Sequence, residues 1–267
     1  MLRSLFTGIS GLRAHQQMLD VTSNNIANVN TAGYKSASTV FGDTLSQTIS
    51  GAGAPAGANG GTNPMQVGLG VQLAGTSTNF SQGSSQYTGR TSDLLINGDG
   101  FFVMNNGGQQ TFTRAGSFSL DSAGHLVSPD GAIVQSATGG DLDLSALSSG
   151  VYKSWSVTSS GVVNGVDATG TTTALGTIAM ATFNNPGGLT KVGDSQYQSS
   201  ANSGAPQIGG ANTGGRGSLT PGYLEMSNVD LAAELTNLII SQRGFQANSR
   251  VITTSDEILQ SLISLKN

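Results

Sequence analysis

The sequence predicts an α+β protein: terminal helices pair as an α-helical coiled coil, with a central all-β antiparallel domain inserted between them. Apolar residues at both ends recur with spacings that alternate between three and four, which is the pattern of a coiled-coil seam. In the middle of the chain the apolar period changes to two, and glycine-containing turns separate the runs. These observations divide the 267 residues into helical ends and a β-rich centre.

The N-terminal helix is predicted within residues 1–35. Its mostly apolar seam reads Leu2, Leu5, Ile9, Leu12, Gln16, Leu19, Ser23 and Ile26. Gly8 and Gly11 lie inside this helix, and each is expected to cost about 1 kcal/mol relative to alanine. The helix therefore needs packing partners to be stable.

A flexible or irregular linker is predicted at residues 36–70. Its central part, "SGAGAPAGANGGTNP" at residues 50–64, consists almost entirely of small residues, glycine and proline. This composition is typical of segments without a packed core of their own.

The central β domain is predicted at residues 71–222. "DLLINGDGFFVMNNGG" contains two apolar runs around an Asn97-Gly98 turn signal. Further short runs follow, separated by turn sequences such as "DSAG" and "PDG".

The C-terminal helix is predicted within residues 223–267. Ser227 and Asn228 are candidate N-caps, and Asp230 and Glu234 give the first turn negative charge. Its seam reads Leu231, Leu235, Leu238, Gln242, Phe245, Ser249, Ile252, Asp256, Leu259 and Ile263, and further apolar residues flank it. One partner helix cannot cover so wide a stripe, so we expect neighbouring subunits to cover the rest.

Composition excludes several classes of protein. The chain has 11 basic and 15 acidic residues and a formal net charge of −4, which argues against a nucleic-acid partner. No apolar run has the roughly 18 residues that a membrane-spanning helix needs, so no membrane insertion is expected. Without cysteines, stabilisation by disulfides is excluded, and oligomerisation is an alternative. The N-terminal residues lack the pattern of a cleaved signal peptide.

No catalytic, cofactor-binding or metal-binding site is predicted. The two histidines, His15 and His125, lack an evident orienting acid and nucleophile. We interpret the three glutamates, Glu225 among them, as a solvated or capping face of the C-terminal helix. Asp141 and Asp143 lack the further oxygen ligands of a calcium loop and are interpreted as an exposed strand edge.

Three motifs resemble the bacterial flagellar axial proteins that build the rod and the hook. They are "SGLRAHQQMLDVTSNNIANVNTAGYKS" near the N-terminus, "TGRTSDLLINGDGFFVM" followed by "FTRAGSFSLDSAGHLVSPDG", and the C-terminal "GYLEMSNVDLAAELTNLIISQRGFQANSRVITTSDEILQSLISLKN". They occur in the order found in that family and cover much of the chain.

The resemblance implies a structural subunit that polymerises with itself. The assembly contacts it implies are the two apolar rows and the asparagine-rich corner that follows the first helix. These residues are Leu2, Leu5, Ile9, Leu12, Leu19, Asn24, Asn25, Ile26, Asn28, Gly33, Tyr34, Leu231, Leu235, Leu238, Gln242, Phe245, Asn248, Ile252 and Leu259.

Within that family, two stretches favour the flagellar hook over the distal rod, namely "YTGRTSDL" and "GGTNPMQVGLGVQ". The expected function is a bendable, tubular joint that links rod to filament and transmits torque in an extracellular appendage. Its expected partners are the distal rod protein, the hook cap, the hook–filament junction proteins and the flagellar type III export apparatus.

Two alternatives stay open. The first is the distal rod protein itself, a stiff shaft of similar length. The second, from another class, is a secreted β-rich glycan-binding or hydrolytic protein, which would need clustered aromatic residues and paired carboxylates.

Overall fold

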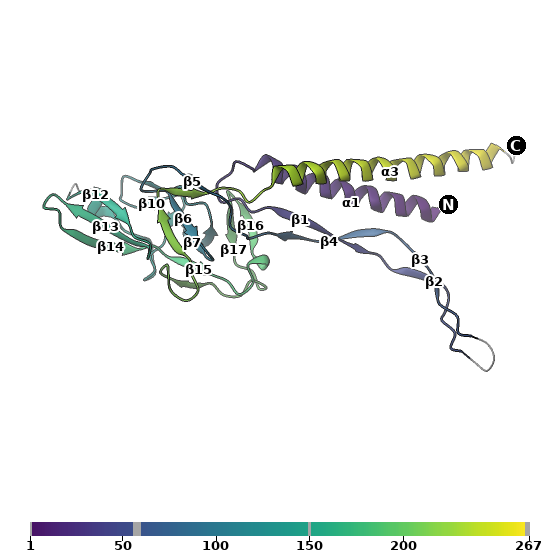
Figure 1. Cartoon of the computed structure of the whole chain (residues 1–267), viewed down its shortest axis with the longest axis horizontal. Helices are drawn as coiled ribbons and strands as arrows, with labels where there is room; N and C mark the ends of the chain where they lie inside the picture. Colours follow the sequence, from purple (N-terminus) through teal and green to yellow (C-terminus); the bar gives the residue numbers. More distant parts are fainter. Residues whose placement is uncertain (1, 56–59, 149–150, 265–267) are drawn as a thin grey trace. The chain divides into compact units, whose positions relative to one another are not determined.

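The computed structural model describes residues 2–55, 60–148 and 151–264, and they form two compact units (Figure 1). The first, here called the helical unit, combines Met1–Ala27, Ala37–Thr78 and Asp230–Asn267. The second, the β unit, combines Asn28–Ser36 and Asn79–Val229. The backbone therefore passes between the units four times, and each unit joins segments that are distant in sequence.

Two long helices, α1 (Leu2–Ala27) and α3 (Leu231–Ser264), lie side by side in the helical unit (Figure 1). They run antiparallel, since Gly8 near the start of α1 lies against Ile252 late in α3. The predicted α+β class with paired terminal helices is confirmed. No helix among the described residues combines the length and apolarity needed to cross a membrane.

Both helices lie inside the segments predicted for them. Within residues 1–35 the helix ends at Ala27, and the following segment belongs to the β unit. The expected C-terminal segment, residues 223–267, begins with a strand, and its cap is Asp230 rather than Ser227 or Asn228. The Asp230 carboxylate Oδ1 accepts hydrogen bonds from the backbone N–H groups of Ala232 and Ala233, at 2.9 and 3.2 Å.

The expected irregular linker at residues 36–70 is wrong, because most of it is β-strand. β1 (Ala37–Asp43) pairs with β4 (Val71–Thr78), and β2 (Ser46–Ser50) pairs with β3 (Met65–Gly68), all antiparallel. Threonine, valine and isoleucine within these strands favour extended backbone, whereas glycine and alanine are densest between β2 and β3. Residues 56–59, inside the glycine-rich stretch, lie outside the described residues.

This ladder also moves the start of the β domain. Residue 71 is the predicted boundary, but β4 pairs with β1 and so belongs to the helical unit. The β unit takes up the chain at Asn79 instead.

The β unit is built on a nine-stranded sheet, whose main path runs β16-β17-β8-β7-β11-β10-β9, while β15 pairs with β7 and β18. Its strands are β7 (Phe101–Asn106), β8 (Gln109–Thr113), β9 (Ser119–Leu120), β10 (Leu126–Val127), β11 (Ile133–Val134), β15 (Met180–Thr182), β16 (Thr190–Gly193), β17 (Gln196–Gln198) and β18 (Gln207–Gly209). Every strand pair in the described residues is antiparallel, as predicted.

Smaller elements complete the β unit. They are the pairs β5 (Ser85–Tyr87) with β20 (Tyr223–Glu225) and β6 (Leu94–Asn97) with β19 (Ser218–Pro221), the three-stranded sheet β12 (Tyr152–Val157), β13 (Val162–Asp167) and β14 (Thr172–Thr177), the short helix α2 (Ser145–Ser148) and the 3-10 turn η1 (Pro186–Gly188). Val157 and Val163 of the three-stranded sheet join the same buried core as the main sheet. That sheet therefore shares the core of the β unit.

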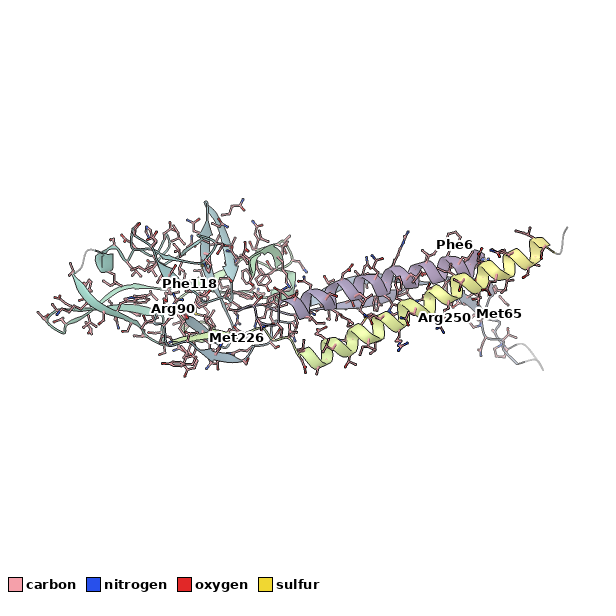
Figure 2. The ribbon with its side chains drawn as sticks, turned by 90° about the horizontal axis from the view of Figure 1, so that it is seen from above. Phe6, Met65, Arg90, Phe118, Met226 and Arg250 are labelled. Atoms are coloured by element: carbon pink, nitrogen blue, oxygen red, sulfur yellow. The ribbon has the colours of Figure 1, made fainter. Side chains whose placement is uncertain are left out.

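Strand β7 separates the two hydrophobic clusters of the β unit. Phe102 and Met104 belong to one cluster and Phe101 and Val103 to the other, because successive side chains of a strand point to opposite faces. In the first cluster, the Phe102 ring meets Phe118 edge-on at 5.1 Å between centroids, and Figure 2 labels Phe118 inside the β unit.

Candidate subunit interface

Small residues, rather than leucines, make the closest contacts between α1 and α3. A Cβ atom added to Gly11 would lie 2.6 Å from Asn248 Nδ2, and one added to Gly244 would lie 2.4 Å from the His15 ring. Gly8 and Gly11 are themselves buried. The glycines that weaken α1 as an isolated helix therefore let the two backbones approach each other closely.

The buried row on each helix is displaced by one residue from the predicted seam. On α1 the buried residues include Gly8, Gly11, Thr22 and Asn25, whereas the predicted row contains Ile9, Leu12, Ser23 and Ile26. On α3 the buried residues are Ser241 and Ser255, whereas the predicted row contains Gln242 and Asp256. The helices pair as predicted, but the predicted leucine row does not form the centre of the contact.

As a result, many predicted apolar positions face solvent in the single chain. Leu5, Leu12, Leu19, Ile26, Leu238 and Leu259 are half-buried, as are Asn248 and Ile252 at the intrachain contact. Leu235 is 46% exposed and Phe245 38% exposed, and Ile9, Leu231 and Gln242 are also exposed. Phe6, outside the predicted row, is 68% exposed on α1 (Figure 2). The Leu2 side chain lies outside the described residues.

In the asparagine-rich corner, the Asn25 side chain forms hydrogen bonds within its own chain. Its Nδ2 donates to the Ala37 carbonyl at 2.7 Å and to Glu234 Oε1 at 2.9 Å, and its Oδ1 accepts from the Ala37 N–H at 3.1 Å. One buried amide therefore joins the end of α1, the start of β1 and the first turn of α3. Asn24 is exposed.

The rest of the corner belongs to the β unit. Gly33 has φ of +70°, and a Cβ there would lie 2.4 Å from the Ala115 nitrogen, so this position requires glycine. Asn28 and Tyr34 line a cavity of about 700 Å³ together with Lys191, whose Nζ lies 4.9 Å from the centroid of the Tyr34 ring. Both residues are half-buried in the single chain.

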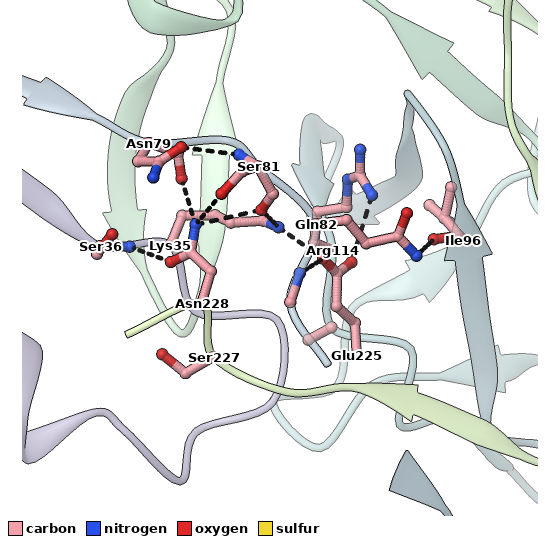
Figure 3. A network of polar contacts seen from close by, with 12 residues as sticks. Lys35, Ser36, Asn79, Ser81, Gln82, Ile96, Arg114, Glu225, Ser227 and Asn228 are labelled. Atoms are coloured by element: carbon pink, nitrogen blue, oxygen red, sulfur yellow. Dashed lines mark hydrogen bonds and ion pairs between the residues drawn. The ribbon is translucent and has the colours of Figure 1, made fainter. Parts of the chain in front are cut away.

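Three charged side chains that are far apart in sequence meet inside the β unit (Figure 3). Lys35 Nζ lies 2.6 Å from Glu225 Oε1, and Arg114 Nη1 lies 3.3 Å from Glu225 Oε2. The side chains of Lys35 and Glu225 are 0% exposed. Burial lowers the pKa of Lys35 from its ordinary value, and the ion pair with Glu225 opposes that shift.

Backbone groups complete this cluster. The Gly83 N–H donates to Glu225 Oε1 at 2.9 Å, and Lys35 Nζ donates to the Ser81 carbonyl at 2.7 Å. The Gly33 N–H donates to the Glu225 carbonyl at 2.8 Å. Asn228 accepts from the Ser36 N–H at 2.8 Å and donates to the carbonyls of Asn79 and Ser81 at 2.8 and 3.2 Å. We call this network, from Gly33–Ser36, Asn79–Gly83, Arg114 and Glu225–Asn228, the polar clamp.

The sequence-based interpretation of Glu225 as a solvated or capping residue is wrong. No local pattern reveals its role, because its partners Lys35 and Arg114 lie 190 and 111 positions away along the chain. Asp141 and Asp143 are exposed as predicted, while Leu142 and Leu144 are buried, but the two aspartates form isolated β-bridges and do not belong to a strand.

Comparison with protein families finds three matches, in the order of the three sequence motifs. Residues 5–35 match "Flagella basal body rod protein", residues 95–165 match "Flagellar hook protein FlgE/F/G D1 domain", and residues 220–265 match "Flagellar basal body rod FlgEFG protein C-terminal". The matched segments include α3, most of α1 and the central strands β7 and β8.

Individual relatives cover the whole chain. It is 48% identical to the flagellar basal-body rod protein FlgG of Bacillus subtilis, over 100% of both chains and 267 aligned positions. It is 36% identical to FlgG of Caulobacter vibrioides, again over 100% of both chains. The flagellar hook protein FlgE of Borreliella burgdorferi is 29% identical, but the alignment extends over 442 positions and so includes long segments that have no counterpart here. The chain therefore belongs to the flagellar rod and hook family of structural proteins.

Proposed function

We propose that this chain is the subunit of the distal rod of the bacterial flagellum, polymerising into a stiff shaft that transmits torque. The full-length match to the Bacillus subtilis rod protein, at 48% identity and with equal length, is the observation that carries this proposal. Three further rod relatives, from Borreliella burgdorferi, Caulobacter vibrioides and Agrobacterium fabrum, are each 36% identical.

This proposal replaces the hook interpretation favoured in the sequence analysis. The hook relatives of Borreliella burgdorferi and Treponema pallidum are 29% and 26% identical, below the rod relatives. Two expectations for a hook subunit do not carry over to a rod subunit. They are the hook cap and hook–filament junction partners, and the extracellular location. Self-assembly and passage through the flagellar type III export apparatus do carry over.

The exposed apolar surface of the helical unit supports self-assembly. Beyond the intrachain contact, α3 exposes Leu235, Ile239, Ile240 and Ile258, with exposed fractions of 46%, 56%, 54% and 52%. Apolar side chains exposed on several faces of a helix favour burial against neighbouring chains. We propose that the predicted apolar rows on both helices contact other copies of this chain.

The β2–β3 ribbon is a second candidate contact. All residues of both strands are exposed, and Leu45 at its base is 86% exposed. A two-stranded ribbon with no hydrophobic face covered is marginal by itself. We therefore expect this ribbon to pack against another subunit in the polymer.

Gene replacement tests the rod assignment directly. The chain is expressed in two Bacillus subtilis strains, one lacking its FlgG rod protein and the other lacking its hook protein, and swimming is measured in soft agar. We expect recovery only in the strain without FlgG. Recovery only in the strain without the hook protein would overturn the rod assignment.

A further inference from the structure

The polar clamp joins segments that flank three of the four places where the backbone crosses between the two units. Gly33–Ser36 precedes the crossing at residues 36/37, Asn79–Gly83 follows the crossing at 78/79, and Glu225–Asn228 precedes the crossing at 229/230. Figure 3 shows the three segments converging on Lys35 and Glu225.

Two shared groups make the contacts of the clamp depend on one another. The Glu225 carboxylate is at once the acceptor for Lys35, Arg114 and the Gly83 N–H. The Asn228 amide is at once the acceptor for the Ser36 N–H and a donor to the Asn79 carbonyl. Neither residue can move without breaking contacts to two other segments.

Burial gives this coupling its strength. An ion pair at the surface can open one partner at a time, because water solvates each freed charge. Lys35 and Glu225 have side chains that are 0% exposed, so separating them in place would leave the buried Lys35 ammonium without its carboxylate, and Glu225 with Arg114 as its remaining charged partner. The segments must therefore open together, with water entering the whole site.

We propose that the polar clamp is a single cooperative unit that opens and closes as a whole. When closed, it holds the β-unit residues next to the crossings at 36/37, 78/79 and 229/230 at fixed distances from one another. If the chain is a rod subunit, as proposed above, force on any one of these connections is shared by the other two. If the contacts were independent, force would instead break them separately, one connection at a time.

Amide hydrogen exchange on the full-length chain tests this cooperativity. Five backbone N–H groups report on the clamp. Gly33 donates to Glu225 O, Ser36 to Asn228 Oδ1 and Asn79 to Ser36 O. Gly83 donates to Glu225 Oε1 and Met226 to Ser84 O. Lys35→Met removes none of these acceptors. We nevertheless expect protection of all five to fall by one common factor, of at least about tenfold.

Three controls accompany the measurement. The Gln135 N–H, bonded to the Val103 carbonyl at 2.9 Å in the core of the β unit, keeps its protection. Lys153→Met, which removes an exposed lysine from the same unit, leaves all five amides unchanged. Lys35→Arg, which keeps the positive charge, restores part of the lost protection.

Unequal changes among the five amides in Lys35→Met, or a change at Gly83 alone, would show independent contacts and overturn the proposal. If Lys35→Met does not fold, Asn228→Ala replaces it, and Gly33, Gly83 and Met226, none of which bonds to Asn228, must lose protection together. The readout uses the monomer and does not involve polymerisation. Failure of the clamp and failure of the rod assignment are therefore distinguishable.

Discussion

At the scale of single residues, glycine in α1 and α3 has a positive role in packing. Gly8, Gly11 and Gly244 each face a side chain of the other helix at a distance that leaves no room for a Cβ atom without movement. The intrinsic penalty of about 1 kcal/mol per helical glycine is thus offset by close contact between the helices.

Replacing one of these glycines separates the effect of helix propensity from the effect of packing between the helices. Gly244→Leu raises helix propensity but places a large side chain where even a Cβ lies 2.4 Å from the His15 ring, so overpacking of about 1–3 kcal/mol dominates. We expect a lower midpoint of thermal unfolding for the helices, followed by circular dichroism at 222 nm. Ala247→Leu at an exposed position of the same helix is the control, and an equal effect there would count against the packing argument.

Tyr197 gives the β unit a dependence on alkaline pH. Burial, with smaller contributions from Tyr34 and Glu225, raises the pKa of its phenol well above the ordinary value of 10.0. The unfolded chain therefore releases the phenol proton first, and the stability present below pH 10 is lost as pH rises beyond it.

The expected result is a free energy of unfolding that falls above pH 10, with a contribution from Tyr197 of at most about 1.4 kcal/mol per pH unit. Tyr197→Phe removes that contribution, measured by urea unfolding of the full chain from pH 8 to 11. Tyr87→Phe, at a tyrosine that is 70% exposed, keeps the slope of the unmodified chain. Identical slopes in both variants would argue against the buried phenol as the cause.

At the scale of elements, each long helix has one row of residues that contacts the other helix and a second, apolar row beside it that is available to other chains. The internal row holds small residues, and the predicted apolar row beside it remains partly exposed. We expect the first to decide the stability of the monomer and the second to decide assembly.

Leu235→Asp tests this division of roles. Leu235 is 46% exposed, so the charge costs the monomer little, within roughly 0.5 kcal/mol. In a polymer the same charge would be buried against a neighbouring chain, at several times that cost. We expect normal monomer unfolding but no polymer in sedimentation, whereas Ala247→Asp still polymerises. Polymers of Leu235→Asp would show that this row is not an interface.

The β2–β3 ribbon gives a separable prediction about mechanics. Deleting residues 50–64 removes its tip and leaves the β1–β4 ladder and the β unit intact. Because the ribbon buries no core, we expect unchanged monomer unfolding and polymers of lower bending stiffness, measured from the persistence length of single polymers in micrographs. An unchanged persistence length would exclude a mechanical role for the tip.

Elements with a clear apolar run or hydrophobic period could be predicted from the sequence. Phe101–Met104 and the two terminal seams identify a central strand and the paired helices, because these signals are local. The β1–β4 ladder was not predicted, because the Gly- and Ala-rich stretch between its strands dominates the composition of residues 36–70.

Contacts between distant residues could not be predicted. The one-residue displacement of the helix contact depends on what Gly11 meets on the other helix, namely Asn248, and a single helix pattern carries no such information. The Lys35–Glu225 pair likewise joins residues 190 positions apart. An alternating apolar row shows that a helix has a contact face, but not which partner covers it.

At the scale of the whole molecule, the chain has few charges and no cysteines, and it exposes apolar side chains along α3 and the β2–β3 ribbon. These features suit a subunit whose final stability comes from neighbouring copies. Head-to-tail contacts that do not close on themselves generate helical filaments, which is the architecture a shaft requires.

Electron microscopy of polymers grown from the purified full-length chain tests the central claim most directly. The claim is that this family member forms a stiff rod rather than a bendable hook. We predict straight tubes whose axes stay straight along their length. Tubes with regular curvature would contradict the rod assignment and return the chain to the hook interpretation.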